Sequence, residues 1–97
     1  MFIVSLTYKT ELSEVDKHID GHVAFLEKYY AKGIFIVSGR KVPRTGGIIL
    51  VQAVNLNEVE KIIEEDPFHI ADLANYDITE FIPTMASKEF EALTKCL

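Results

Sequence analysis

The chain has 97 residues, 48% of them apolar, which is enough to fill one compact core but leaves little room for a second. No apolar run approaches the roughly 20 residues that cross a bilayer, so we expect no membrane partner. The net charge is −5, and no basic cluster is long enough to follow a phosphate backbone, which argues against a nucleic-acid partner. We therefore predict a single domain over residues 1–97.

The start of the chain and its cysteine content bear on where the protein works. Met1–Tyr8 has no basic stretch before its apolar residues and no small-residue cleavage site after them, so it is more typical of a first strand than of a signal peptide. The single cysteine, Cys96, can form no intrachain disulfide and is a poor candidate for a ligand or nucleophile. Both observations favour a reducing, cytoplasmic location.

The first two elements have clear periodicities. Phe2–Tyr8 alternates β-branched and aromatic residues as a strand does. Ser13 precedes acidic residues like a helix N-cap, and apolar residues then recur at helical spacing through Glu14–Lys32. Gly33 is a typical helix stop, so we predict one long helix over that range.

The rest of the chain also alternates between strand and helix patterns, with Pro and Gly at the turns. The pattern predicts, in order, a strand over Ile34–Gly39, a strand over Ile48–Val54, a helix from Asn55 or Asn57 to Glu65, a strand over Ala74–Ile82 and a short helix over Ser87–Lys95. The order strand, helix, strand, strand, helix, strand is that of the ferredoxin-like βαββαβ fold. We therefore predict an α+β domain with a four-stranded antiparallel sheet and both long helices on one face.

The two central strands indicate a partner for this sheet. Both of their faces are apolar, with Ile34 and Ile36 opposite Phe35 and Val37, and Ile48 and Leu50 opposite Ile49 and Val51. Two helices cover one face only, and an antiparallel sheet with a solvated face normally carries polar residues there. We therefore expect a homodimer packed through the sheet face.

His22 is the first candidate functional residue. On a helical wheel it falls near the middle of the apolar stripe of the first long helix, and His18 falls at its edge. An imidazole in that position needs hydrogen-bond partners and is sensitive to a nearby carboxylate. The alternative is a core histidine bonded to a backbone carbonyl.

Asp66 is the second candidate. Asp followed by Pro67 is a common way to begin a helix, and this structural role competes with a functional one. In the functional interpretation the carboxylate also orients or ionises a histidine, as in general acid–base pairs. The two roles are compatible.

The connection from Ser38 to Gly47 is the third candidate. Its glycines let backbone amides approach a ligand, and Arg40 and Arg44 supply permanent cations for a carboxylate or phosphate. The alternative is an ordinary hairpin loop with solvated arginines. We predict no metal site, because the spacing of His18 and His22 lacks the intervening glutamate of the zinc-protease motif.

These motifs together resemble the YCII-related (YciI-like) family. They are the run His22–Leu26, Gly33, Ser38-Gly39, Asp66-Pro67-Phe68, Tyr76 with Ile78, and the loop Pro43–Gly47, which is similar to that of small bacterial members. The resemblance implies a ferredoxin-like fold assembled as a dimeric α/β barrel. It also implies an active site formed by His22 and Asp66. The chain departs from the family pattern at His18, where many relatives have arginine, and at Arg40, where many have proline.

From residues and resemblance together we hypothesise a cofactor-independent enzyme of lyase, isomerase or dehalogenase type. His22 would act as general acid or base, Asp66 would fix its tautomer, and Ser38, Arg40 and Arg44 would bind a small anionic or aromatic molecule. A competing hypothesis is a non-catalytic ligand-binding or structural dimer in which His22 and Asp66 only stabilise the fold. A third is an interaction module for a larger protein.

Overall fold

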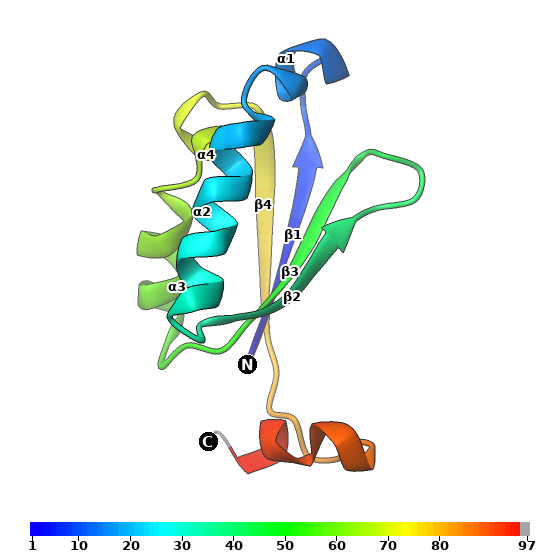
Figure 1. Ribbon diagram of the computed structural model, residues 1–97, viewed down its shortest axis with the longest axis vertical. Helices are drawn as coiled ribbons and strands as arrows, with labels where there is room; N and C mark the ends of the chain where they lie inside the picture. The colour runs from blue at the N-terminus through cyan, green and yellow to red at the C-terminus, as the bar shows by residue number, and fades with distance from the viewer. Residues whose placement is uncertain (96–97) are drawn as a thin grey trace.

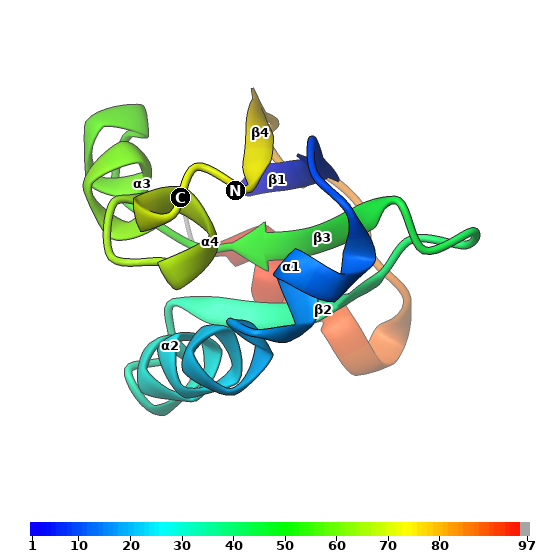
Figure 2. The same cartoon turned by 90° about the horizontal axis from the view of Figure 1, so that it is seen from above.

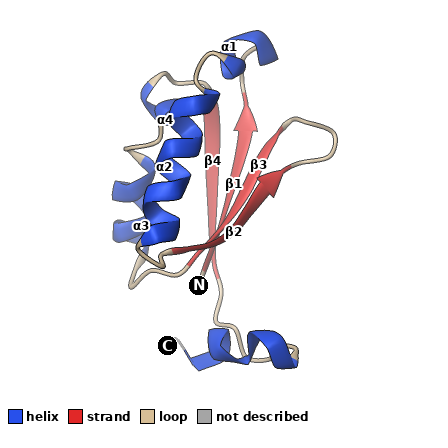
Figure 3. Cartoon of the chain, in the orientation of Figure 1, coloured by secondary structure: helices blue, strands red, loops and turns tan. Residues whose placement is uncertain are grey.

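A computed structural model describes residues 1–95 and contains one four-stranded antiparallel sheet in the order β2-β3-β1-β4. Helices α2, α3 and α4 lie on one side of this sheet and leave the other side open (Figures 1 and 3). The elements are β1 (Phe2–Tyr8), α1 (Leu12–Asp16), α2 (Ile19–Ala31), β2 (Phe35–Arg40), β3 (Gly46–Val51), α3 (Leu56–Ile63), α4 (Pro67–Ile70), β4 (Ala74–Glu80) and the 3-10 helix η1 (Lys88–Lys95). The predicted α+β class and antiparallel sheet are confirmed.

The core lies between the sheet and the helices. Phe2, Val4 and Leu6 project from β1 toward the helices with exposed fractions of 2% or less. The amphipathic helix α3 buries Val59, Ile62 and Ile63 against them. Asn55, the first of the two predicted starting residues, is the N-cap of α3, and its side chain accepts a hydrogen bond from the backbone N–H of Glu58.

The first long helix differs from the prediction. It is divided at Lys17 and His18 into α1 and α2, and Ser13 lies inside α1 rather than at its cap. The backbone N–H of His18 bonds to the carbonyl of Val15, three residues back, and this tighter turn redirects the chain. Val15 thereby becomes fully buried while α2 runs along the sheet.

The division also changes which side chains of α2 face inward. The buried residues of α2 are Phe25 and Tyr29, whereas Val23 and Tyr30, two of the apolar residues that recur at helical spacing, are 43% and 37% exposed. Gly33 ends the helix as predicted, with a positive φ of 72° that glycine adopts without strain.

The open face of the sheet is less apolar than predicted. A bulge between Phe35 and Val37 puts these two residues on opposite faces, although strict alternation placed them on one. Val37 then joins Ile3 and Ile48 on the open face, with exposed fractions of 57%, 37% and 38%. On β4 the outward positions are polar, namely Asn75, Asp77 and Thr79. The open face is therefore apolar around Ile3, Val37 and Ile48 but polar along β4, the strand that lies at the edge of the sheet beside β1 (Figure 2).

The C-terminal part of the chain stands apart from the sheet, beyond the end of β4 (Figure 1). The predicted short helix is a 3-10 helix whose Phe90 is 55% exposed, so its apolar side is not packed on the core. Cys96 lies outside the described residues. Within residues 1–95, no helix is both long and apolar enough to cross a bilayer.

Candidate functional site

Asp66 is placed by the turn that joins α3 to α4. Pro67 occupies the first position of α4, and the Asp66 carboxylate caps this helix by accepting the Phe68 backbone N–H at Oδ1, 3.0 Å away. The side chain is fully buried. A buried carboxylate needs several donors, because water no longer solvates it.

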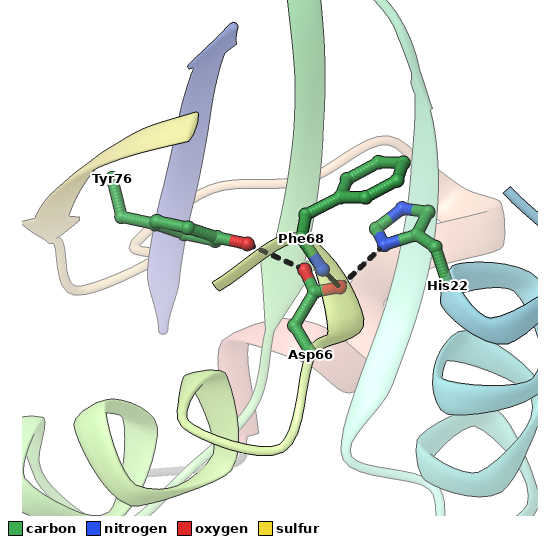
Figure 4. Close-up of polar contacts among 4 residues, drawn as sticks. All are labelled: His22, Asp66, Phe68 and Tyr76. Carbon is green, nitrogen blue, oxygen red and sulfur yellow. Dashed lines mark hydrogen bonds and ion pairs between the residues drawn. The ribbon is translucent and has the colours of Figure 1, made fainter. Parts of the chain in front are cut away.

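His22 supplies the second donor. Its Nδ1 lies 2.8 Å from Asp66 Oδ1, and its ring stacks on Phe68 with centroids 4.0 Å apart and planes 9° from parallel (Figure 4). A Cβ atom on Gly21 would come within 3.1 Å of Pro67 Cγ, so the lack of a side chain there favours the close approach of α2 to α4. The His22 side chain keeps 14% of its surface exposed.

Tyr76 supplies the third donor from β4. Its hydroxyl donates to Asp66 Oδ2 at 2.6 Å (Figure 4). Burial and then the charge of Asp66 raise the pKa of Tyr76, so the phenol stays protonated and donating. Tyr76 was not among the site residues predicted from the sequence. The alternation of side chains along β4 could have indicated its position, because it puts Tyr76 on the helix-facing side of the sheet, opposite Leu6.

A cavity of about 370 Å³ opens beside His22, between α2 and the β2–β3 hairpin. His22 and Phe68 line it together with the three predicted ligand-binding residues, Ser38, Arg40 and Arg44. Ser38 and Arg40 face the helices because they pair with Ile49 and Gly47 of β3. Asp66 does not line the cavity but lies behind His22. The structure therefore brings the five predicted residues together.

The polar groups of this cavity differ in how they are paired. The Ser38 hydroxyl is 2.5 Å from the Tyr30 hydroxyl. Arg44 Nη2 donates to Asp16 Oδ1 at 2.6 Å, and this hydrogen bond raises the pKa of the Arg44 guanidinium. Arg40 has no carboxylate partner among residues 1–95.

Gly46 has a structural role in addition to its place in the cavity lining. A Cβ atom there would lie 1.8 Å from the carbonyl oxygen of Leu6, so β3 can pair with β1 only if this position has no side chain. Gly46 and Gly47 both line the cavity, and Gly47 pairs with Arg40 across the two strands.

In the part of the chain that the structure describes, no group of three or more His, Cys, Asp or Glu side chains is placed to hold a metal ion. His18 lies at the N-cap of α2 without capping it through its side chain.

The sequence profile of the YCII-related domain matches residues 1–82 of the chain. The chain belongs to the YCII-related family. This YCII-related domain includes the whole sheet and the His22–Asp66 pair, whereas η1 lies beyond the matched region. The family assignment made from the spaced motifs is confirmed. A comparison with curated protein sequences finds no match.

Solved structures include a similar chain, 5-chloro-2-hydroxyhydroquinone dehydrochlorinase (TftG) from Burkholderia phenoliruptrix, in complex with 2,5-dihydroxybenzoquinone. The two chains superpose with a TM-score of 0.72 at 22% sequence identity, over 82% of this chain and 91% of the other. At this identity the likeness establishes a shared fold.

Proposed function

We propose that this YCII-related protein is a cofactor-independent enzyme that uses His22 and Asp66 for acid–base chemistry on a small anionic or aromatic molecule. One observation carries the proposal: Asp66 engages Nδ1 of His22, a residue that also lines the cavity. This arrangement fixes the neutral tautomer with the proton on Nδ1 and leaves Nε2 to exchange a proton with a bound molecule.

Each remaining group has a defined task in such a reaction. Nε2 of His22 takes a proton from a hydroxyl or activated C–H group, and Asp66 stabilises the resulting imidazolium. Arg40 stabilises the oxyanion or enolate that forms, and Ser38 adds a hydrogen bond. Expulsion of a halide from the ring then completes an elimination, with net loss of a hydrogen halide. Return of the proton to another atom completes an isomerisation instead.

The size of the cavity and the neighbouring structure support a one-ring substrate. A cavity of about 370 Å³ is within the range of small-molecule sites. The structurally similar dehydrochlorinase has a name that specifies a chlorinated, hydroxylated ring, and its complex contains a dihydroxybenzoquinone. We extend only this class, a single oxygenated ring, to the present chain.

A screen for turnover tests the proposal. Small organic acids and halogenated, hydroxylated phenols are incubated with the protein in D2O, and NMR and chloride release report proton exchange, isomerisation or dehalogenation. The matched variant is His22→Gln, whose amide can still bond to Asp66 but cannot act as a base. We expect turnover by the natural protein and a loss of about 10²- to 10⁴-fold in the variant. Equal rates for both would contradict the assignment.

The non-catalytic alternative is favoured by one observation, the role of Asp66 as the cap of α4. In that interpretation the His22 hydrogen bond only pairs a buried carboxylate. The two functions separate on one result, because a purely structural pair predicts that His22→Gln changes stability while no member of the panel is turned over.

We also infer a homodimer through the sheet face, in the manner of a dimeric α/β barrel. The apolar area formed by Ile3, Val37 and Ile48 supports this inference, since solvated sheet faces are normally polar. Light scattering after gel filtration should give twice the monomer mass of 11.0 kDa for the natural protein. The variant Val37→Lys should have the mass of a monomer.

A further inference from the structure

We propose that the cavity selects ring compounds carrying a single oxyanion group, and that Asp16 sets this selection by neutralising Arg44. The inference rests on the proposed function only in taking the cavity beside His22 as the substrate site. It requires no chemical step, so it can be tested by binding alone.

The two arginines of the cavity are not equivalent. Arg44, on the loop between β2 and β3, donates to Asp16 Oδ1 at 2.6 Å, and this ion pair joins the loop to the end of α1. Its charge is already balanced where it meets the cavity. Arg40 has no carboxylate partner among residues 1–95, so its charge is the one available to a ligand.

The opposite end of the cavity disfavours a second negative charge. Asp66 lies directly behind His22 with no exposed surface, so a carboxylate is buried at this end of the cavity. The hydrogen bond from Tyr76 pairs this carboxylate but adds no positive charge. A ligand anion is therefore attracted to the Arg40 end of the cavity. A second anionic group would lie either beside the neutral Arg44–Asp16 ion pair or near the repelling Asp66 carboxylate.

The walls between these ends are mostly apolar. Phe68, stacked with His22, lines the cavity together with the ring of Tyr8 and with aliphatic side chains that include Leu6, Ile19, Leu26 and Ile49. Such a surface receives the faces of a planar ring, whereas a flexible polar chain would be desolvated without partners. The favoured ligand is thus one ring with one oxyanion group directed at Arg40.

Three probes of similar shape and different charge test this inference: benzamide, benzoate and isophthalate, with zero, one and two charges at neutral pH. Amide chemical-shift titrations at low salt give the dissociation constants, and the shifts of Gly47 and His22 show that the probe occupies the cavity. The variant is Asp16→Asn, which retains an acceptor for Arg44 but removes the balancing charge. The control is Asp20→Asn, which makes the same charge change at an exposed residue outside the cavity lining.

We expect the natural protein to bind benzoate more tightly than benzamide and at least as tightly as isophthalate. In Asp16→Asn the affinity for isophthalate should rise about two- to fivefold while that for benzoate changes by less than about twofold, since a solvent-accessible ion pair contributes modestly. Asp20→Asn should leave the ratio unchanged. Arg40→Gln should abolish the preference for benzoate over benzamide.

Any of three results would overturn the inference. They are tighter binding of isophthalate than of benzoate by the natural protein, an unchanged ratio of the two affinities in Asp16→Asn, and absence of binding of all three probes at the cavity. The acid–base proposal fails separately, since His22→Gln can leave these affinities intact whether or not the natural protein turns a substrate over.

Discussion

The substitution Asp66→Asn examines the centre of the site without knowledge of the substrate. The carboxylate accepts hydrogen bonds from Phe68 N, His22 Nδ1 and Tyr76 Oη at 3.0, 2.8 and 2.6 Å. Asparagine is a good N-cap, so its single oxygen preserves the bond to Phe68. Its amide nitrogen replaces the other oxygen, however, and faces the donating hydroxyl of Tyr76.

The magnitude follows from these contacts. A hydrogen bond to a charged group contributes about 1.5–3 kcal/mol, and at least one such bond to Asp66 is lost. We expect the free energy of unfolding at neutral pH to fall by about 2–3 kcal/mol, measured by urea denaturation with linear extrapolation. Asp77→Asn is the control, because Asp77 is exposed on the opposite face of β4 and its replacement should change stability by less than about 0.5 kcal/mol.

A loss below about 0.5 kcal/mol in Asp66→Asn would refute this reasoning. It would mean that the three hydrogen bonds do no more than offset the cost of burying the carboxylate, as some buried ion pairs do. A gain in stability would carry the same conclusion further and would make a tightly organised acid–base pair untenable.

Further predictions concern both the site and its scaffold. Tyr76→Phe should lower the free energy of unfolding in urea by about 1–2 kcal/mol. An unchanged stability in this variant would contradict a stabilising role for the hydrogen bond from Tyr76 to Asp66. Burial raises the pKa of Tyr29 to about 12 from 10.0, so its contribution to stability is complete below pH 10 and declines as pH rises from 10 toward 12. Urea titrations at pH 9 and 11 should show this decline, and Tyr29→Phe should reduce it; an equal decline in the variant would contradict the assignment. Gly46→Ala should lower the free energy of unfolding by about 2 kcal/mol or more and with it the melting temperature, because its Cβ would clash with a β1 carbonyl. Gly39→Ala, with open space around it, should change the free energy of unfolding little. A well-folded Gly46→Ala protein with an unchanged melting temperature would rule out this close strand contact.

Much of the fold could be predicted because local patterns and tertiary contacts agree. The Asn55 cap, the Asp66-Pro67 start of α4 and the Gly33 stop are each local chemical rules that the fold obeys. The division of the first helix could not be predicted, since the apolar spacing continues past His18 and only packing of Val15 into the core requires the turn. The bulge after Phe35 is likewise a property of strand pairing.

The candidate site shows the same division between local and distant information. His22 and Asp66 were found from a helical wheel and a dipeptide, and their contact joins residues 44 positions apart. Tyr76 and Asp16 were missed as members of the site, because their partners lie on other elements and neither residue is unusual where it stands. Strand alternation indicates which way Tyr76 points but not that its hydroxyl meets the Asp66 carboxylate.

The most direct test of the central claim, that His22 and Asp66 form an oriented acid–base pair at the cavity, is the tautomer of His22. Long-range ¹H–¹⁵N NMR distinguishes the two ring nitrogens of a neutral imidazole. The arrangement predicts a proton on Nδ1, held by Asp66, and an unprotonated Nε2 that shifts when a ligand enters the cavity. A neutral His22 with its proton on Nε2 would contradict the account, because the nitrogen assigned to take the proton would already carry one.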